Sequence, residues 1–162
     1  MQAVGISRAV LVQPSVYGTD NRALLDALKA DSADTLRGIV VVPPDLDDSA
    51  LDRMHDLGVR GVRINPMNAN GLPLSALTTL DRRLYERGWH VQLQIDVERC
   101  VDLEERLGLV TVPVVIDHFG FVDVKRGCGG EGFARLRRLV ERGTCYVKIS
   151  APYRLSAFDR VP

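Results

Sequence analysis

The sequence lacks the features that would place it in several special classes of protein. No apolar run approaches the roughly 20 residues that span a bilayer, and the first seven residues lack the basic-then-apolar layout of a signal peptide. Acidic and basic residues balance at 21 each, without a long block of like charge. These absences predict a cytoplasmic protein whose partner is a small molecule rather than nucleic acid or a membrane.

Cysteine is scarce. The three thiols are Cys100, Cys128 and Cys145, and no two of them form a C-x-x-C pair. An odd number leaves one thiol unpaired under any disulfide scheme, which suits a reducing compartment. We therefore interpret all three cysteines as structural or incidental.

The chain does contain a regular alternation of two kinds of segment. Runs rich in Val and Ile, each of strand length, recur at residues 9–13, 38–42, 61–65, 90–96, 112–118 and 145–150. Between them, apolar residues recur at helical spacing. These sets are Leu24, Leu25 and Leu28; Leu51, Met54 and Leu57; Leu77, Leu80 and Leu84; Cys100, Leu103 and Leu107; and Phe133, Leu136 and Val140. Asp47 or Asp48 can cap the second helix, and glycines 58, 88, 108 and 143 stand where helices should end.

Alternating strands and helices predict an α/β fold with a parallel sheet, either closed as a barrel or open and doubly wound. Polar residues within the strands favour the barrel. Pairs that share one strand face are Arg63 with Asn65, Gln92 with Gln94, and Lys148 with Ser150. Polar groups on one face, near the carboxyl ends of parallel strands, are typical of a lumen that opens into an active site.

The length sets a limit on this barrel. A complete eight-stranded (β/α) barrel takes about 250 residues, whereas this chain has 162 residues and six strand segments. We expect one partial (β/α) barrel domain of the TIM-barrel type over residues 1–162, truncated so that the first and last strand-helix units are missing. The unpaired sheet edges of such a domain would favour a homo-oligomer.

His118 is the leading candidate for a catalytic residue. It ends the run Val-Val-Ile-Asp-His at the carboxyl tip of a strand, where barrels place their catalytic groups. A neutral imidazole there can accept a proton, polarise a carbonyl or ligate a metal. Asp117 has the opposite strand parity and is expected to point toward the helix layer or to hold a loop. His55 and His90 are interpreted as structural.

Two arginines and a tyrosine are candidates for binding the substrate. Arg63 faces the predicted lumen and Arg154 follows the sixth strand on the same rim, so both guanidinium groups suit a carboxylate. Surface arginine remains the alternative, more so for Arg154. Tyr17 lies in the loop that leaves the first strand and is either a hydrogen-bond donor to substrate or a packed loop aromatic.

Residues 127–132 match the dinucleotide-binding pattern G-x-G-x-x-G. The preceding strand ends at His118 with a loop between, and the strand that follows ends without an acidic residue for a ribose hydroxyl. A loop at the active site is therefore the preferred interpretation, and a nucleotide-binding open sheet is a third and weaker possibility.

Five segments together carry a resemblance to a known family. They are residues 10–21 (VLVQPSVYGTDN), 58–65 (GVRGVRIN), 89–94 (WHVQLQ), 117–120 (DHFG) and 147–154 (VKISAPYR). In order and spacing the chain resembles the amidohydrolase-related TIM-barrel hydrolases (amidohydrolase 2), and within them the 2-pyrone-4,6-dicarboxylate lactonase-like branch. The resemblance covers nearly the whole chain.

This resemblance implies hydrolysis of a lactone, ester or amide bond in a small carboxylated compound. In the family, water is activated between a first-strand H-x-H pair, a late-strand His and a final-strand Asp. His118 matches the late His, whereas the H-x-H pair and the final Asp have no counterpart here. The resemblance further implies that Arg63, Tyr17 and Arg154 bind carboxylates and that Asn65, Gln92 and Gln94 orient the ring. Phe121 stands where an arginine often follows the His-x-Gly.

The resemblance bears on cofactors as well. Metal-dependent relatives offer a histidine where this chain has Gln92 and Gln94, which favours the metal-independent branch, because an amide is a poor ligand beside imidazole. We therefore expect no tightly held cofactor; a divalent metal such as Zn would use His118. The alternative to an enzyme is a non-catalytic barrel remnant that associates with itself.

Overall fold

The computed structural model describes residues 5–155, in which strands and helices alternate as the sequence predicts. The strands are β1 (Ala9–Val12), β2 (Leu36–Val40), β3 (Val59–Ile64), β4 (His90–Leu93), β5 (Val114–Ile116) and β6 (Cys145–Val147). The α-helices are α1 (Arg22–Lys29), α2 (Asp48–Asp56), α3 (Ala76–Glu86), α4 (Leu103–Gly108) and α5 (Glu131–Glu141). Short 3-10 segments are η2 (Ser15–Tyr17), η3 (His118–Phe121), η4 (Val124–Gly129) and η5 (Pro152–Arg154).

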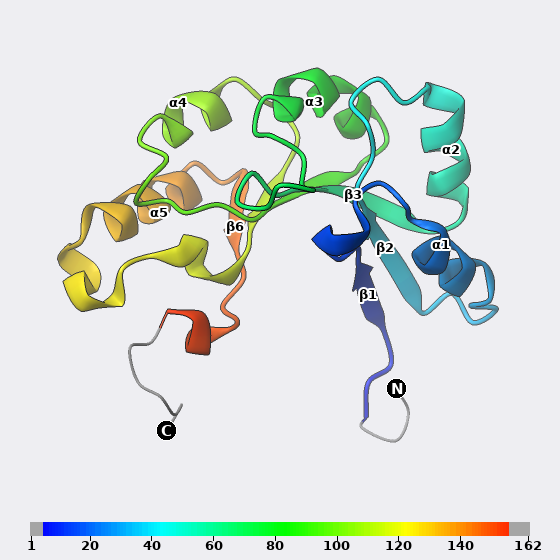
Figure 1. Cartoon of the computed structure of the whole chain (residues 1–162), viewed down its shortest axis with the longest axis horizontal. Helices are drawn as coiled ribbons and strands as arrows, with labels where there is room; N and C mark the ends of the chain where they lie inside the picture. The colour runs from blue at the N-terminus through cyan, green and yellow to red at the C-terminus, as the bar shows by residue number, and fades with distance from the viewer. Residues whose placement is uncertain (1–4, 156–162) are drawn as a thin grey trace.

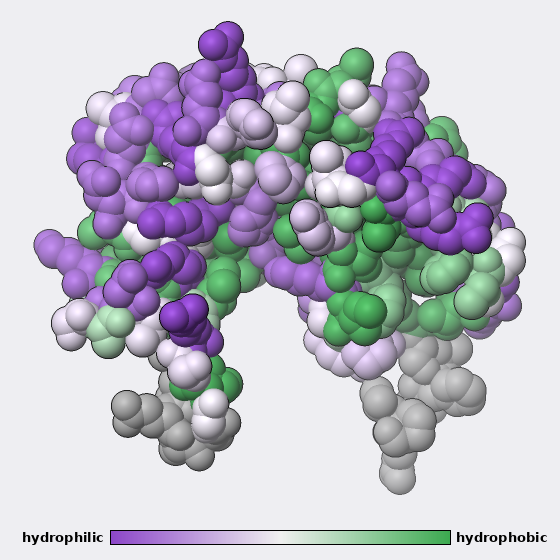
Figure 2. Space-filling model, turned by 180° about the vertical axis from the view of Figure 1, so that it is seen from behind, coloured by the Kyte–Doolittle hydropathy of each residue, from purple (hydrophilic) through white to green (hydrophobic). Residues whose placement is uncertain are grey.

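The strands form one parallel sheet whose spatial order is β1-β2-β3-β4-β5-β6, the same as their order in the chain. The sheet curls into an arch with the helices on its convex side (Figure 1). A doubly wound sheet would reverse its strand order partway, so the barrel-type prediction is confirmed. The concave side is an open hollow between the two ends of the arch (Figure 2).

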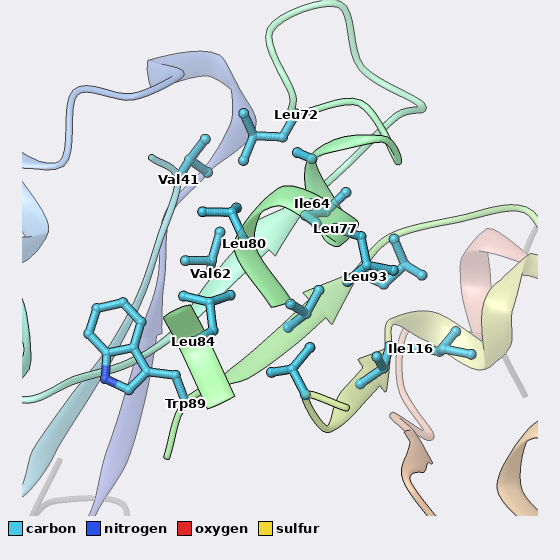
Figure 3. Packing of buried hydrophobic residues seen from close by; sticks show 14 of the residues in the cluster. Val41, Val62, Ile64, Leu72, Leu77, Leu80, Leu84, Trp89, Leu93 and Ile116 are labelled. Carbon is cyan, nitrogen blue, oxygen red and sulfur yellow. The ribbon is translucent and has the colours of Figure 1, made fainter. Parts of the chain in front are cut away.

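The hydrophobic core lies between the outer face of the sheet and the helices. Val62, Ile64 and Leu93 are fully buried against Leu80 and Leu84 of α3 (Figure 3). Each such side chain contributes about 1.5–3 kcal/mol when it leaves water. This layer fixes which side chains of each strand face the hollow.

Glycines allow close contacts and helix ends in this layer. A side chain at Gly38 would come within 2.8 Å of Leu24 and Leu28, so α1 packs directly on the backbone of β2. Gly58 and Gly143 follow α2 and α5 with φ of 101° and 80°, values that favour glycine. The predicted helix ends are confirmed there.

For two helices the structure adds to the sequence prediction: it decides between two possible caps of α2 and corrects the predicted buried face of α5. Of the two possible caps for α2, Asp47 is the one that accepts a hydrogen bond from the Ala50 amide (2.7 Å). In α5 the predicted apolar face is wrong in part, because Phe133 is exposed and the buried positions include Leu139. Within the described residues, the helices are too short or too polar to cross a bilayer.

Candidate active site

Polar side chains project into the hollow from the carboxyl ends of successive strands. The backbone ladder runs one step past the regular strands, so these residues are held as firmly as strand residues. The amides of Gln94, Asp117 and Lys148 donate to the carbonyls of Ile64, Leu93 and Ile116 at 2.9, 2.9 and 2.8 Å. Side chains from β3, β4, β5 and β6 therefore lie at one mouth of the arch.

Arg63 of β3 links three other strands. Its Nη1 donates to the Gln13 carbonyl at the end of β1 (3.1 Å), and its Nη2 donates to the Gln94 amide oxygen. The guanidinium side chain is 13% exposed and lies 3.7 Å from the Asp117 carboxylate. Burial lowers the pKa of Arg63, and the Asp117 charge opposes this shift in part. The predicted inward orientation of Arg63 agrees with these contacts.

Asp117 is the centre of the cluster, which corrects the expectation that it faces the helix layer. Its Oδ2 accepts a hydrogen bond from the Gln92 amide (2.9 Å), and its Oδ1 lies 3.1 Å from Lys148 Nζ. The carboxylate is thus buried between Lys148 and Arg63. The regular strand ends at Ile116, but the ladder continues through Asp117, which therefore keeps the inward parity.

His118 lies beyond the strand, in a left-handed segment. Residues 118, 119, 120 and 121 have φ of 52°, 54°, 63° and 56°, although only Gly120 is a glycine. Left-handed backbone costs roughly 1–2 kcal/mol per ordinary residue, and such strain gathers at functional sites. The segment is held by the Phe119 amide, which donates to the Lys148 carbonyl (3.0 Å), and by the Gly120 amide, which donates to the Asp117 carbonyl (2.9 Å).

The imidazole of His118 is placed by two neighbours. Its Nδ1 forms a hydrogen bond with Ser150 Oγ (2.9 Å), and its ring meets Phe121 edge-on at a centroid distance of 5.9 Å. Burial lowers the pKa of His118; the Asp117 charge opposes this, and the charges of Arg154 and Lys148 lower it further. The lowered pKa favours the neutral form of the ring, which is able to accept a proton.

The other predicted site residues lie around this centre. Asn65 donates from Nδ2 to Ser15 Oγ (2.7 Å) and so ties the β3 end to η2, the segment that carries the exposed Tyr17. Arg154 is exposed in η5, beside the ring of Tyr153 at 5.7 Å. The segment η5 is in contact with η3, which begins at His118, so Arg154 lies at the same end of the arch.

Three contributors were not singled out by sequence reasoning. Lys148 and Ser150 were placed on the inward face of the sixth strand, yet neither was chosen as a site residue. Asp117 was given the wrong direction. The signal that could have found them is the alternation itself, because Asp117 follows two residues after Val115, which pairs in register with the inward-facing Gln92 of β4.

The surroundings of His118 do not suit a divalent metal ion. Among residues 5–155, no three His, Cys, Asp or Glu side chains are grouped so that they could hold one. The carboxylate nearest to His118 in sequence, Asp117, is already paired with Lys148 and lies beside Arg63. The two cations repel a further cation and the carboxylate between them is already paired, so these residues do not fit a zinc site.

Comparison with known proteins assigns the family. The model of the family described as Amidohydrolase matches residues 1–162. The chain belongs to the amidohydrolase family. The family resemblance inferred from the sequence motifs is thereby confirmed.

Relatives of this amidohydrolase chain include 2-pyrone-4,6-dicarboxylate hydrolase from Comamonas testosteroni, 35% identical over 94% of this chain and 51% of that protein. Among solved structures, a Pseudomonas putida protein provisionally assigned as a 2-pyrone-4,6-dicarboxylic acid hydrolase is 43% identical, with a TM-score of 0.84 over 98% of this chain and 58% of that one. A similarly assigned Acinetobacter baumannii protein, solved with citric acid bound, is 32% identical, with a TM-score of 0.82 over 98% of this chain and 60% of the other. The chain spans about half the length of the curated relative.

Proposed function

We propose that this amidohydrolase chain takes part in hydrolysis of a lactone, or of a related ester or amide, in a small carboxylated compound. The observation that carries the proposal is that His118 lies in one cluster with the inward cations: the amide of Phe119, the next residue, donates to the Lys148 carbonyl, and Asp117, the preceding residue, contacts both Lys148 and Arg63. A cyclic ester with carboxylate groups suits such a mouth, since the cations bind the carboxylates while the imidazole meets the carbonyl.

In this proposal His118 polarises the scissile carbonyl or helps to activate water. Arg63 and Arg154 bind carboxylates of the substrate, and Tyr17 donates a hydrogen bond from the β1 loop. Asn65 and Gln94 orient the ring at the ends of β3 and β4. Gln92 acts indirectly, by holding Asp117, because its side-chain amide donates a hydrogen bond to that carboxylate.

The proposal includes no step through a metal ion, because the cations beside His118 disfavour one. We further propose a cytoplasmic setting, a small carboxylated molecule as the partner rather than nucleic acid or a membrane, and association of copies through the sheet edges. The balanced charge of 21 acidic and 21 basic residues supports the small-molecule partner.

The test is an assay of the full chain with 2-pyrone-4,6-dicarboxylate in the presence of EDTA. Hydrolysis is measured as the loss of the pyrone absorbance. We expect turnover, and we expect His118→Ala to reduce it roughly a hundredfold to ten-thousandfold, the usual range for a general acid or base. His55→Gln is the matched control, because His55 accepts a hydrogen bond from Trp89 in the outer layer (2.9 Å). Equal rates for the wild-type chain and His118→Ala would refute the role of His118.

The second candidate is a non-catalytic barrel remnant. The observation in its favour is that β1 and β6 each pair with a single neighbour in the described sheet, which leaves two edges free for another copy. Size-exclusion chromatography combined with the assay separates the candidates. A stable oligomer without turnover favours the remnant, and turnover that depends on His118 favours the enzyme.

A further inference from the structure

Lys148 differs from the other cation of the cluster in how far it reaches solvent. The Lys148 side chain is 37% exposed, whereas those of Arg63 and Asp117 are 13% and 2% exposed. Both nitrogens at the tip of Arg63 already donate to protein acceptors, to Gln13 and Gln94. Lys148 is therefore the inward cation with more of its surface facing the open hollow.

The contact between Lys148 and Asp117 is one of charge rather than a directed hydrogen bond. Lys148 Nζ lies 3.1 Å from Asp117 Oδ1, yet this oxygen has no aligned hydrogen-bond donor among the described residues. An ammonium group carries three protons on a flexible stem. The Asp117 carboxylate therefore attracts the ammonium group of Lys148 and holds it in place, while the N–H donors of that group stay available to a ligand.

The backbone fixes this lysine in the same unit as His118. The Lys148 amide donates to the Ile116 carbonyl (2.8 Å), and its carbonyl accepts from the Phe119 amide (3.0 Å). The residue directly after β6 thus supports the strained turn that carries His118. The charge of Lys148 also lowers the pKa of His118, which agrees with their closeness.

We propose that Lys148 binds a carboxylate of the substrate directly and that the buried carboxylate of Asp117 positions it. This inference rests on the proposed function and adds a residue to that site. Arg63, Lys148 and Arg154 then face the substrate, and among the described residues the carboxylate that contacts both Arg63 and Lys148 is Asp117. The excess of positive charge selects compounds with two or more carboxylates over those with one.

The alternative is a structural ion pair in which Lys148 only balances the buried charge of Asp117. The two roles differ in what a substitution changes. Loss of a structural partner lowers the melting temperature and leaves the affinity of the folded protein for an anion unchanged. Loss of a binding cation weakens that affinity in protein that is still folded.

The experiment measures binding of citrate to the full chain by titration calorimetry, and binding of 2-pyrone-4,6-dicarboxylate in the same way with His118→Ala added to every protein so that turnover is slow, with each variant shown to be folded by its melting curve. Lys148→Met is expected to weaken both affinities roughly tenfold to a hundredfold, the size of one charge-assisted hydrogen bond. Lys29→Met is the matched control, since it removes the same charge from the last turn of α1 on the convex side. Lys148→Arg should retain the affinity within a few-fold, and Lys148→Gln replaces Lys148→Met should the latter not fold.

Asp117→Asn tests the positioning role. In that background, Lys148→Met should have a clearly smaller effect, because the ammonium group is no longer held toward the ligand. An equal effect in both backgrounds refutes positioning by Asp117. Affinities of Lys148→Met that match those of Lys29→Met overturn the binding role of Lys148 while the wild-type binding still supports the proposed function; a wild-type chain that binds neither probe overturns both.

Discussion

His90 and His118 both belong to the inward side of the arch, and burial lowers the pKa of each below its ordinary value of 6.5. For His90 at the start of β4, the charge of Lys148 lowers the pKa further. When the pKa of a histidine is lower in the folded state than in the unfolded state, the unfolded chain binds a proton first as the pH falls. Acid therefore favours unfolding. Because the charge of Lys148 lowers the pKa of both histidines, it makes the free energy of unfolding depend more strongly on pH in acid.

The expected consequence is a loss of stability as the pH falls. The stabilising effect of a neutral His90 is complete above pH 6.5 and is lost as the pH falls from that value through the lower pKa of the folded state. His90→Gln removes this titration, so its free energy of unfolding should fall less between pH 7 and pH 5. Urea unfolding at several pH values measures the slope, and parallel curves for the two proteins would contradict the assignment.

Among single side chains, residue type and strand parity predicted the inward direction of Arg63 and the two glutamines, whereas His118 was predicted from its place at the tip of a strand. The sequence did not predict the direction of Asp117. The reason is physical: the left-handed turn begins at His118, so strand parity holds through Asp117 and fails one residue later. His118 was predicted to be a strand residue that faces the lumen, and Asp117 was therefore given the opposite direction.

The turn η3 is the element on which the position of His118 depends. A Cβ at Gly120 would lie 2.6 Å from Cγ1 of the buried Val97, at a φ of 63° that L-residues disfavour. The amide of Val97 also donates to the Gly120 carbonyl (2.9 Å), so the two segments cannot separate freely. Gly120 thus joins the loop after β4 to the turn that carries His118.

Gly120→Ala is expected to destabilise the protein by about 2–4 kcal/mol, the sum of a left-handed backbone and an overpacked contact. It should also reduce turnover, because the turn must shift. Gly129→Ala is the control, since no heavy atom lies within 4 Å of a Cβ there. Denaturant unfolding compares the two variants, and equal stabilities would show that the turn adapts without cost.

In the molecule as a whole, the repeated strand-helix pattern was enough to predict six strands, their parallel pairing and the curled sheet. Strand ends were less accurate, since the second and third strands begin two residues earlier than the apolar runs suggest. Those residues are set by pairing with neighbours, as in the register of Ala9 with Leu36, which a single segment does not reveal. The prediction of the buried face of α5 was wrong for a similar reason, because Arg135 is buried by a hydrogen bond to the Val97 carbonyl of another segment.

The outer core is continuous from α1 to α5, so we expect the chain to unfold in one step. Trp89, which is 1% exposed and donates from Nε1 to His55 Nδ1 (2.9 Å), reports on this core by fluorescence. Its transition in urea should coincide with that of far-ultraviolet circular dichroism. Separate midpoints would instead reveal that the two ends of the arch unfold independently.

The strand order has a consequence for synthesis of the protein. Because each strand lies beside the one that precedes it in the chain, a ribosome delivers every new strand next to a partner that has already emerged. The sheet can grow by one strand and one covering helix at a time, with the edge of β1 and the newest edge unpaired at each stage. Codon changes that alter the pace of translation between units should then change the yield of folded protein less than in folds whose first strand pairs with the last.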